Sequence, residues 1–197
     1  MTDIFSELVT AYGLVILAAT VFFAALGAPV PGTALLVLSG AFAASGDMDT
    51  TWVALTAFGA AVIGDFTGYF LGLSGGDWLK EKLGRTRFAN QVFKAEKLMA
   101  KWGGIGIFLS RWLIAPVGPT LNYVAGIGQF GWRRFLLWDS LGEAVWVALY
   151  VSIGMVFSAT ALALVDAIAS ASWLILGGIG MYLMGMRLLK VARKAKV

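Results

Sequence analysis

The chain is 197 residues long, with 59% hydrophobic residues, 13% charged residues and a formal net charge of +4. Soluble domains usually carry about a quarter charged residues, so this composition excludes an ordinary water-soluble fold and predicts one integral membrane domain. Because the chain has no cysteine and no histidine, disulfides, thiolate metal sites and imidazole chemistry are excluded as well. No basic side chain precedes the first apolar run, so we expect no cleaved signal peptide.

The first half of the chain contains an interrupted apolar region and a continuous one. Leu8–Gly46 is long enough for two membrane passes but is broken by Pro29-Val30-Pro31-Gly32. Thr51–Leu73 can cross the bilayer as one helix, which takes about 20 residues. Glycines recur at every fourth position along this second segment and just beyond it, a spacing that lets membrane helices pack closely: they are Gly64, Gly68, Gly72 and Gly76.

A basic segment separates this half from a second interrupted region, Ile105–Phe130, which is broken by Pro116-Val117-Gly118-Pro119. The stretch Ile105–Ala115 would form only about 16 Å of helix, roughly half the hydrocarbon thickness. Phe135–Phe157 and Ala167–Met186 then qualify as full spans. The first of them carries its own row of small residues, Ser140, Ala144, Ala148 and Ser152, and each row can pack within one chain or in a homo-oligomer.

The two breaks resemble each other. Ala28–Thr33 and Ala115–Thr120 agree at four of six positions, and Gly40 and Gly126 follow at similar distances. Paired, Gly/Pro-interrupted apolar segments in two halves of a chain are typical of the substrate site of a transporter. The alternative is chance similarity in a Gly- and Ala-rich sequence.

The distribution of charge predicts the topology. The segments 1–7, 46–51 and 158–172 contain acidic residues but no lysine or arginine. The positive-inside rule places these segments outside and the basic segments in the cytoplasm. This assignment requires both interrupted regions to return to the side from which they enter, the first opening outward and the second inward. The basic residues are Lys80, Lys82, Arg85, Arg87, Lys94, Lys97, Lys101, Arg133, Arg134, Arg187, Lys190, Arg193, Lys194 and Lys196.

We therefore predict an all-α integral membrane protein with two re-entrant helical hairpins in an inverted repeat and about three transmembrane helices. Its segments are 1–76, the first hairpin and a span; 77–104, a basic cytoplasmic segment; 105–158, the second hairpin and a span; and 159–197, a last span and a basic tail. The protein is expected in the inner (plasma) membrane as a multi-pass protein with a cytoplasmic C-terminus.

Four ionisable residues fall inside apolar segments: Asp65, Arg111, Asp139 and Glu143. A charge in the bilayer costs a few kcal/mol, so each should be paired or face water, and Arg111 is the natural partner of the acids. Asp139 and Glu143 are four residues apart on one helical face, which invites a cation or a proton. Asp139 lies near the end of its helix, where it can meet water or Arg133, and it receives the least functional weight. The charges either only hold the fold together or line a substrate path.

The candidate transport site consists of these four residues with Thr33, Thr120 and Asn122. The hairpin breaks are Pro29, Pro31, Gly32, Pro116, Gly118 and Pro119. No nucleophile–base pair, metal cluster or phosphate loop has usable spacing. We therefore predict no enzymatic activity, no catalytic residue, no metal, no cofactor and no nucleic-acid partner.

Several longer motifs carry a family resemblance. They are Pro29-Val-Pro-Gly32, Leu38-Ser-Gly40, Gly64-Asp65-Phe-Thr-Gly68-Tyr69-Phe-Leu-Gly72, Lys101-Trp-Gly103, Phe108-Leu-Ser-Arg111-Trp, Ala115-Pro116 through Ala125-Gly126, and Gly142 to Trp146. Over Gly27–Gly154 the sequence resembles the DedA family, also called SNARE-associated or VTT-domain proteins. The resemblance implies two facing re-entrant hairpins and a role in lipid transport: flipping of a polyprenyl-phosphate carrier in bacteria, and phospholipid scrambling in eukaryotic relatives.

The resemblance also identifies departures from the family pattern. The acid that the family carries after Pro-Gly is Thr33 here, the first hairpin arginine matches Arg111, and the second arginine falls at Gly118-Pro119. Glu143 is acidic where the family often has a small residue.

Three functions are compatible with the sequence. The leading hypothesis is a flippase or scramblase for an anionic lipid, such as undecaprenyl phosphate, with possible proton coupling through a carboxylate. The second is a proton- or ion-coupled exporter of small cations. The third is a membrane assembly or homeostasis factor that transports nothing.

Overall fold

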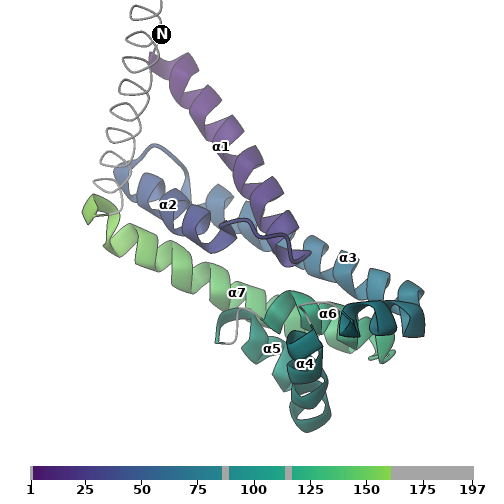
Figure 1. Cartoon of the computed structure of the whole chain (residues 1–197). Helices are drawn as coiled ribbons and strands as arrows, with labels where there is room; N and C mark the ends of the chain where they lie inside the picture. The colour runs from purple at the N-terminus through teal and green to yellow at the C-terminus, as the bar shows by residue number, and fades with distance from the viewer. Residues whose placement is uncertain (1, 86–88, 114–116, 161–197) are drawn as a thin grey trace, which may run out of the picture. The chain divides into compact units, whose positions relative to one another are not determined.

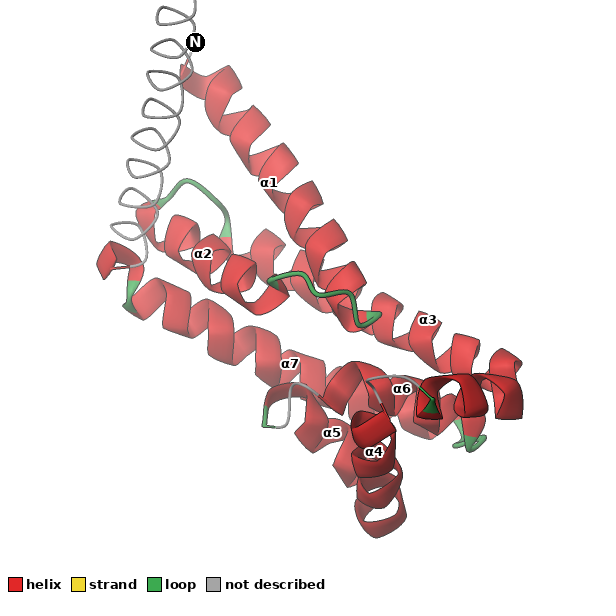
Figure 2. Ribbon diagram, in the orientation of Figure 1, coloured by secondary structure: helices red, strands yellow, loops and turns green. Residues whose placement is uncertain are grey.

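The computed structural model describes residues 2–85, 89–113 and 117–160. The chain forms two compact units, Met1–Ser158 and Ala159–Val197, and the helices discussed below belong to the first. Every regular element within the described residues is an α-helix (Figures 1 and 2). This confirms the predicted all-α class. The third predicted span, Ala167–Met186, lies outside the described residues.

Long and short helices alternate along the first unit. The long ones are α1 (Thr2–Ala25), α3 (Thr50–Gly84) and α7 (Trp132–Val156); the short ones are α2 (Gly32–Ser45), α4 (Ala89–Trp102), α5 (Gly104–Trp112) and α6 (Gly118–Ile127).

Two of the long helices have the length and composition of membrane spans. Thr50–Gly76 of α3 has 27 residues and α7 has 25, or about 40 and 37 Å of helix against about 30 Å of hydrocarbon. Large apolar side chains such as Leu137, Leu141 and Leu149 are exposed along α7. These exposed side chains suit a lipid environment better than water.

The interrupted regions fold as two helix pairs joined at the Pro-containing breaks. In the first pair α1 ends at Ala25 and α2 begins at Gly32, directly after Pro31; in the second pair α6 begins at Gly118 with Pro119 in its first turn. Proline fits there because the first turn of a helix needs no N–H donor. At about 21, 14 and 15 Å, α2, α5 and α6 are too short to cross a bilayer. In contrast, α1 with 24 residues is longer than half a membrane.

Each of the two long spans packs against one helix from each interrupted region. α3 packs most extensively on α6 and α1, and α7 packs on α2 and α5. Glycines allow the closest crossings. A Cβ atom on Gly72 would overlap the carbonyl of Tyr123 on α6, and one on Gly40 of α2 would lie 2.5 Å from the carbonyl oxygen of Val151 on α7.

The predicted rows of small residues have different outcomes. Gly64 and Gly72 do make close helix contacts within the chain, as expected. Gly76 does not extend the row: it has φ 47°, no atom lies within 4 Å of a Cβ built on it, and it kinks α3. The row on α7 does not pack within the chain, since Ala144, Ala148 and Ser152 are exposed; its packing in a homo-oligomer stays a prediction. The packing face of α7 carries Gly142 and Gly154 instead.

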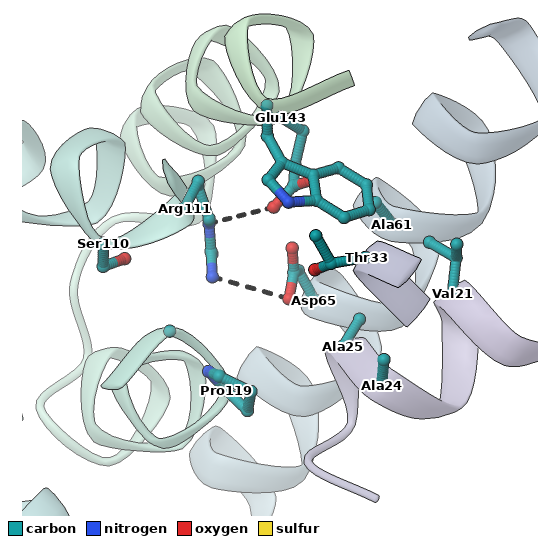
Figure 3. A pocket seen from close by; sticks show the side chains of 12 residues that line it. Val21, Ala24, Ala25, Thr33, Ala61, Asp65, Ser110, Arg111, Pro119 and Glu143 are labelled. Carbon is teal, nitrogen blue, oxygen red and sulfur yellow. Dashed lines mark ion pairs between the residues drawn. The ribbon is translucent and has the colours of Figure 1, made fainter. Parts of the chain in front are cut away.

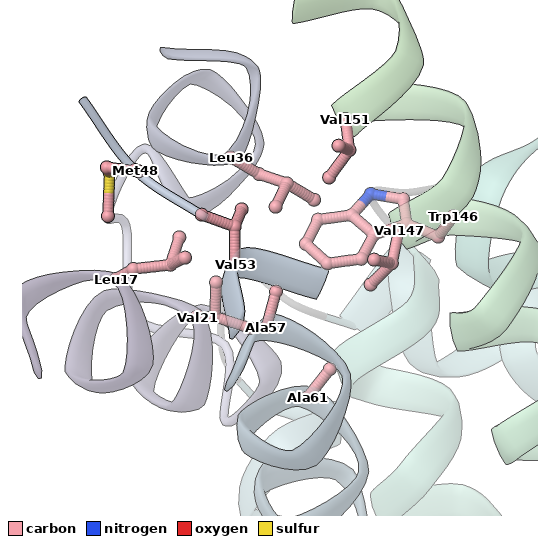
Figure 4. Packing of buried hydrophobic residues seen from close by; sticks show 10 residues of the cluster. All are labelled: Leu17, Val21, Leu36, Met48, Val53, Ala57, Ala61, Trp146, Val147 and Val151. Carbon is pink, nitrogen blue, oxygen red and sulfur yellow. The ribbon is translucent and has the colours of Figure 1, made fainter. Parts of the chain in front are cut away.

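Two apolar clusters occupy the interior of the first unit. One joins α1, α2, α3 and α7 around Leu17, Leu36, Val53 and Trp146 (Figure 4). The other cluster contains Tyr69 of α3 and Phe135 of α7, which pack with Ile107 of α5 and Leu121 of α6. Along both α3 and α7, the buried acids stand between the residues of the two clusters.

Candidate functional site

A buried cluster of four charged side chains lies between α3, α5 and α7. The guanidinium of Arg111 pairs with three carboxylates: its Nη1 atom lies 3.5 Å from Asp65 Oδ1, its Nε atom lies 3.5 Å from Glu143 Oε1, and Nη2 pairs with Asp139 Oδ1. The side chains are only 2%, 3%, 8% and 0% exposed, in the order Arg111, Asp65, Glu143 and Asp139. Figure 3 shows Arg111 reaching from α5 toward Asp65 and Glu143. The predicted partnership of Arg111 with the acids is therefore present.

Asn122 of α6 connects this cluster by hydrogen bonds. Arg111 Nη2 donates to Asn122 Oδ1 at 2.6 Å, and Asn122 Nδ2 donates to Asp65 Oδ1 at 2.6 Å. The same amide nitrogen lies 3.5 Å from the carbonyl oxygen of Ala25, and the hydroxyl of Tyr123 donates to the carbonyl of Leu26 at 2.9 Å. The last carbonyls of α1 have no helical partner of their own, and α6 supplies donors to them. The two interrupted regions are thus hydrogen-bonded to each other at the site.

The position of Arg111 depends on a glycine in α7. A Cβ atom on Gly142 would lie 2.7 Å from Arg111 Cγ and 2.9 Å from the carbonyl oxygen of Phe108. Any larger residue would push the end of α5 away from α7, because real Cβ contacts are not that short. The absence of a side chain at position 142 therefore brings Arg111 beside Glu143, the next residue in the chain.

The other half of the molecule repeats this contact. A Cβ atom on Gly64 of α3 would lie 2.7 Å from the Cβ of Ala25 and 2.8 Å from the carbonyl oxygen of Phe22, at the end of α1. Gly64 is followed by Asp65, as Gly142 is followed by Glu143. The two acids thus occupy corresponding positions, and the residue that corresponds to Arg111 is Ala25. The cluster has one cation because only one of the two halves supplies an arginine.

A cavity of about 120 Å³ opens beside the cluster. The first residues of α2 and α6 border it, so both breaks meet there. Its apolar wall comes mainly from the first half of the chain, and its charged wall from α3, α5 and α7. The lining residues are Val21, Ala24, Ala25, Thr33, Ala61, Asp65, Ser110, Arg111, Gly118, Pro119, Glu143 and Trp146.

The cluster has unused polar capacity and an excess of negative charge. Asp65 Oδ2, Asp139 Oδ2 and Arg111 Nε are buried and have no hydrogen-bond partner among the residues that the structure describes. Three ionised carboxylates and one guanidinium would carry a formal charge of −2, which is costly to bury. One oxygen from each carboxylate lies within 4.8 Å of the others. The cluster can therefore accept a proton or a cation in addition to Arg111.

Comparison with known proteins places this architecture in a family. The model of the VTT domain matches residues 30–156, a range that contains all four charged residues, the second break and all of the first break except Pro29. The chain belongs to the DedA (VTT-domain) family. Positions 65 and 111 therefore lie within the part of the chain that matches the domain.

Several known membrane proteins are similar to the chain in sequence. An uncharacterized membrane protein of Synechocystis is 31% identical over 64% of this chain and 59% of its own length. Protein DedA of Escherichia coli is 29% identical over 77% of this chain and 73% of its own length. The membrane protein YbfM of Bacillus subtilis is 22% identical over 78% of this chain and 96% of its own length. The chain thus spans less than two thirds of the length of the Synechocystis relative. No solved structure matches the chain.

One sequence-based expectation about this DedA-family site was wrong. Asp139 was expected to meet water or Arg133 near the end of α7, but the residue is 0% exposed and pairs with Arg111. Helices α5 and α3 pack against this part of α7, and the position of Asp139 within its own helix does not reveal that packing.

The remaining candidates are distributed unevenly. Thr33, Gly118 and Pro119 border the cavity, and Gly32 is buried at the start of α2. Thr120 is half-buried and does not line the cavity, whereas Pro29 and Pro31 are exposed in the first break. Pro116 lies outside the described residues. The lining residue that sequence reasoning missed is Trp146, although its spacing of three residues from Glu143 places both on one helical face.

Proposed function

We propose that this DedA-family protein moves an anionic lipid across the plasma membrane, with Arg111 binding the lipid phosphate. The observation that carries the proposal is the position of Arg111. Of the basic side chains whose burial the structure describes, it alone is buried, and it borders the cavity at which both breaks meet. Guanidinium groups bind phosphate with two parallel hydrogen bonds, and the starts of α2 and α6 favour an anion in the same place.

The proposal includes two re-entrant hairpins in an inverted repeat, α1–α2 opening to the outside and α5–α6 to the cytoplasm. The corresponding contacts of Gly64 with α1 and of Gly142 with α5 support such a repeat, as does the packing of each span on one helix of each pair. The positive-inside rule then places the basic segments and the C-terminus in the cytoplasm.

The size of the cavity favours a small phosphate group over a large headgroup. The cavity is small, at about 120 Å³, which suits a phosphate monoester better than a phosphoglycerol or phosphoethanolamine group. A polyprenyl monophosphate such as undecaprenyl phosphate has that headgroup, and its hydrocarbon chain can stay in the lipid during transport.

Competition between anions for Arg111 supplies a coupling mechanism. A phosphate can use the guanidinium only when at least one carboxylate gives up its contact. Proton binding by Asp65, Asp139 or Glu143 removes a negative competitor and one charge from the buried excess, so it favours phosphate binding. Loss of that proton on the opposite side restores the carboxylate contact and favours release. The carboxylates thus exchange with the substrate, and a proton moves with it.

Translocation of a fluorescent polyprenyl phosphate in proteoliposomes tests the proposal. We expect Arg111→Lys, which keeps the charge but loses the paired donors, to lower the initial rate at least tenfold, while Arg133→Lys at the exposed start of α7 leaves it unchanged. Because Arg111→Ala leaves three buried carboxylates without their cation, a folding defect alone would make that variant uninformative. A wild-type rate in folded Arg111→Lys would refute the assignment.

The carboxylates support a second candidate, a proton-coupled exporter of a small cation. The formal excess of two negative charges and three oxygens within 4.8 Å suit a cation as well as a proton. Flux of a monovalent cation into proteoliposomes under an imposed pH gradient, with no lipid translocation, would favour this function over the first.

A further inference from the structure

Helix α4 presents a basic face that the site does not use. Val92, Ala95 and Met99 point inward, and α4 packs mainly on α6. Phe93, Lys94, Lys97 and Lys101 are exposed on another side of the helix. These four residues, separated by one, three and four positions, form the basic face of α4. Lys94 and Lys97 form no ion pair with any residue that the structure describes.

Two glycines turn the chain away from the spans on either side of this helix. Gly76 has φ 47° and Gly103 has φ 51°, a backbone conformation that favours glycine because other residues are strained in it. Gly76 is the last residue of the part of α3 long enough to cross a membrane, and α5 begins directly after Gly103. In Figure 1, α4 points away from the long axis of α7. The end of α3 after Gly76 and helix α4 therefore diverge from the direction of the spans.

Tryptophans near both glycines indicate the level of the membrane surface. Trp78 is 64% exposed and Trp102 is 45% exposed. Lys82 Nζ lies 4.7 Å from the centre of the Trp78 ring, and Lys101 Nζ lies 5.3 Å from that of Trp102. Exposed Trp beside Lys is typical of the headgroup layer, where an amphipathic ring and a cation are both solvated. We therefore place α4 at that layer.

We propose that the basic face of α4 binds the headgroups of anionic lipids at the membrane surface, with Phe93 inserted between them. Phe93 is 66% exposed in the middle of three lysines. An exposed phenyl ring among cations gains nothing in water, but lysines with an aromatic side chain are the usual composition of a helix that lies on anionic lipid. The aromatic group favours a membrane over a soluble polyanion. The proposal does not depend on the transport function or on Arg111.

The cysteine-free chain allows a direct test. Asn90→Cys lies on an exposed part of α4 and carries a fluorophore without background labelling. The full-length labelled protein is reconstituted in phosphatidylcholine vesicles that contain the same fraction of shallow-brominated phosphatidylglycerol or shallow-brominated phosphatidylcholine. Quenching by each brominated lipid measures its local concentration at α4. The test variant replaces Lys94, Lys97 and Lys101 by glutamine, and the matched control replaces Lys190, Lys194 and Lys196, with the same change in net charge.

Each lysine near an anionic surface contributes about a fivefold preference. We expect phosphatidylglycerol to be enriched at α4 at least fivefold over phosphatidylcholine, and the enrichment to disappear in the α4 variant and in high salt. It should persist in the tail control and in Arg111→Lys. Equal quenching by the two lipids in the wild type, or undiminished enrichment in the α4 variant, would overturn the proposal. So would binding of a short oligonucleotide without lipid enrichment.

Discussion

Replacement of Asn122 by alanine tests whether the buried network depends on α6. The side chain makes two hydrogen bonds of 2.6 Å, one to Arg111 and one to Asp65, and both partners are buried. Hydrogen bonds to charged groups are worth about 1.5–3 kcal/mol each in soluble proteins, whereas polar contacts between membrane helices average about 0.6 kcal/mol and reach about 1.7. Since the variant also leaves two charged groups with one partner fewer, we expect a loss of about 3 kcal/mol in the free energy of unfolding.

Thermal unfolding in detergent measures this loss. For a domain of this size about 3 kcal/mol corresponds to a fall of about 6–12 °C in Tm. Thr120→Ala is the matched control, because Thr120 lies two residues earlier on α6 and outside the cavity; its Tm should stay within about 2 °C of the wild type. If Asn122→Ala and Thr120→Ala unfold at the same temperature, the hydrogen-bonded bridge between Arg111 and Asp65 does not stabilise the protein as described.

Three further predictions concern packing, pairing and pH. Gly126→Ala places a Cβ against the α3 backbone and should cost about 1–3 kcal/mol of unfolding free energy, whereas Gly59→Ala, which lies inside a helix and meets open space, should not destabilise the protein; equal values would contradict the close crossing. Asp139→Ala should destabilise by about 1.5–3 kcal/mol, because Arg111 loses a charge-assisted hydrogen bond but keeps its ion pairs with Asp65 and Glu143, whereas a water-exposed Asp139 would give no change. Lipid translocation should rise as the pH on the loading side falls, because protonation removes a competitor for the guanidinium, and Glu143→Gln should flatten this dependence; a rate that rises with pH would have the wrong sign.

The spans and the charge partnership were predictable from the sequence for simple physical reasons. A run of more than 20 apolar residues such as Thr51–Leu73 can hardly be anything other than a helix of membrane length. A charge in such a run needs a partner, and Arg111 is the basic residue that interrupts an apolar region. Both predictions depend on local composition and on the cost of burying charge, and neither needs the tertiary arrangement.

The features that sequence reasoning missed depend on how distant segments pack. Asp139 lies seven residues into α7, and the packing of α5 and α3 on α7 is what buries it. The row of Ser140, Ala144, Ala148 and Ser152 has the same spacing as the glycines of α3. It nevertheless lies away from the face of α7 that packs against other helices of the chain. Gly76 continues a regular spacing, yet its positive φ ends the straight part of α3. Spacing along one helix cannot tell which face meets a neighbour.

The most direct test of the account is the side of the membrane on which the ends of the two helix pairs lie, because the proposed inverted arrangement would explain why both breaks meet at Arg111. Thr2→Cys and Ser45→Cys mark the ends of the first helix pair, and Lys101→Cys and Gln129→Cys mark those of the second. In spheroplasts, a membrane-impermeant maleimide should label the first two and spare the second two, and inside-out vesicles should give the reverse. If Thr2 and Ser45, or Lys101 and Gln129, are labelled from opposite sides, that helix pair crosses the membrane and the account is contradicted.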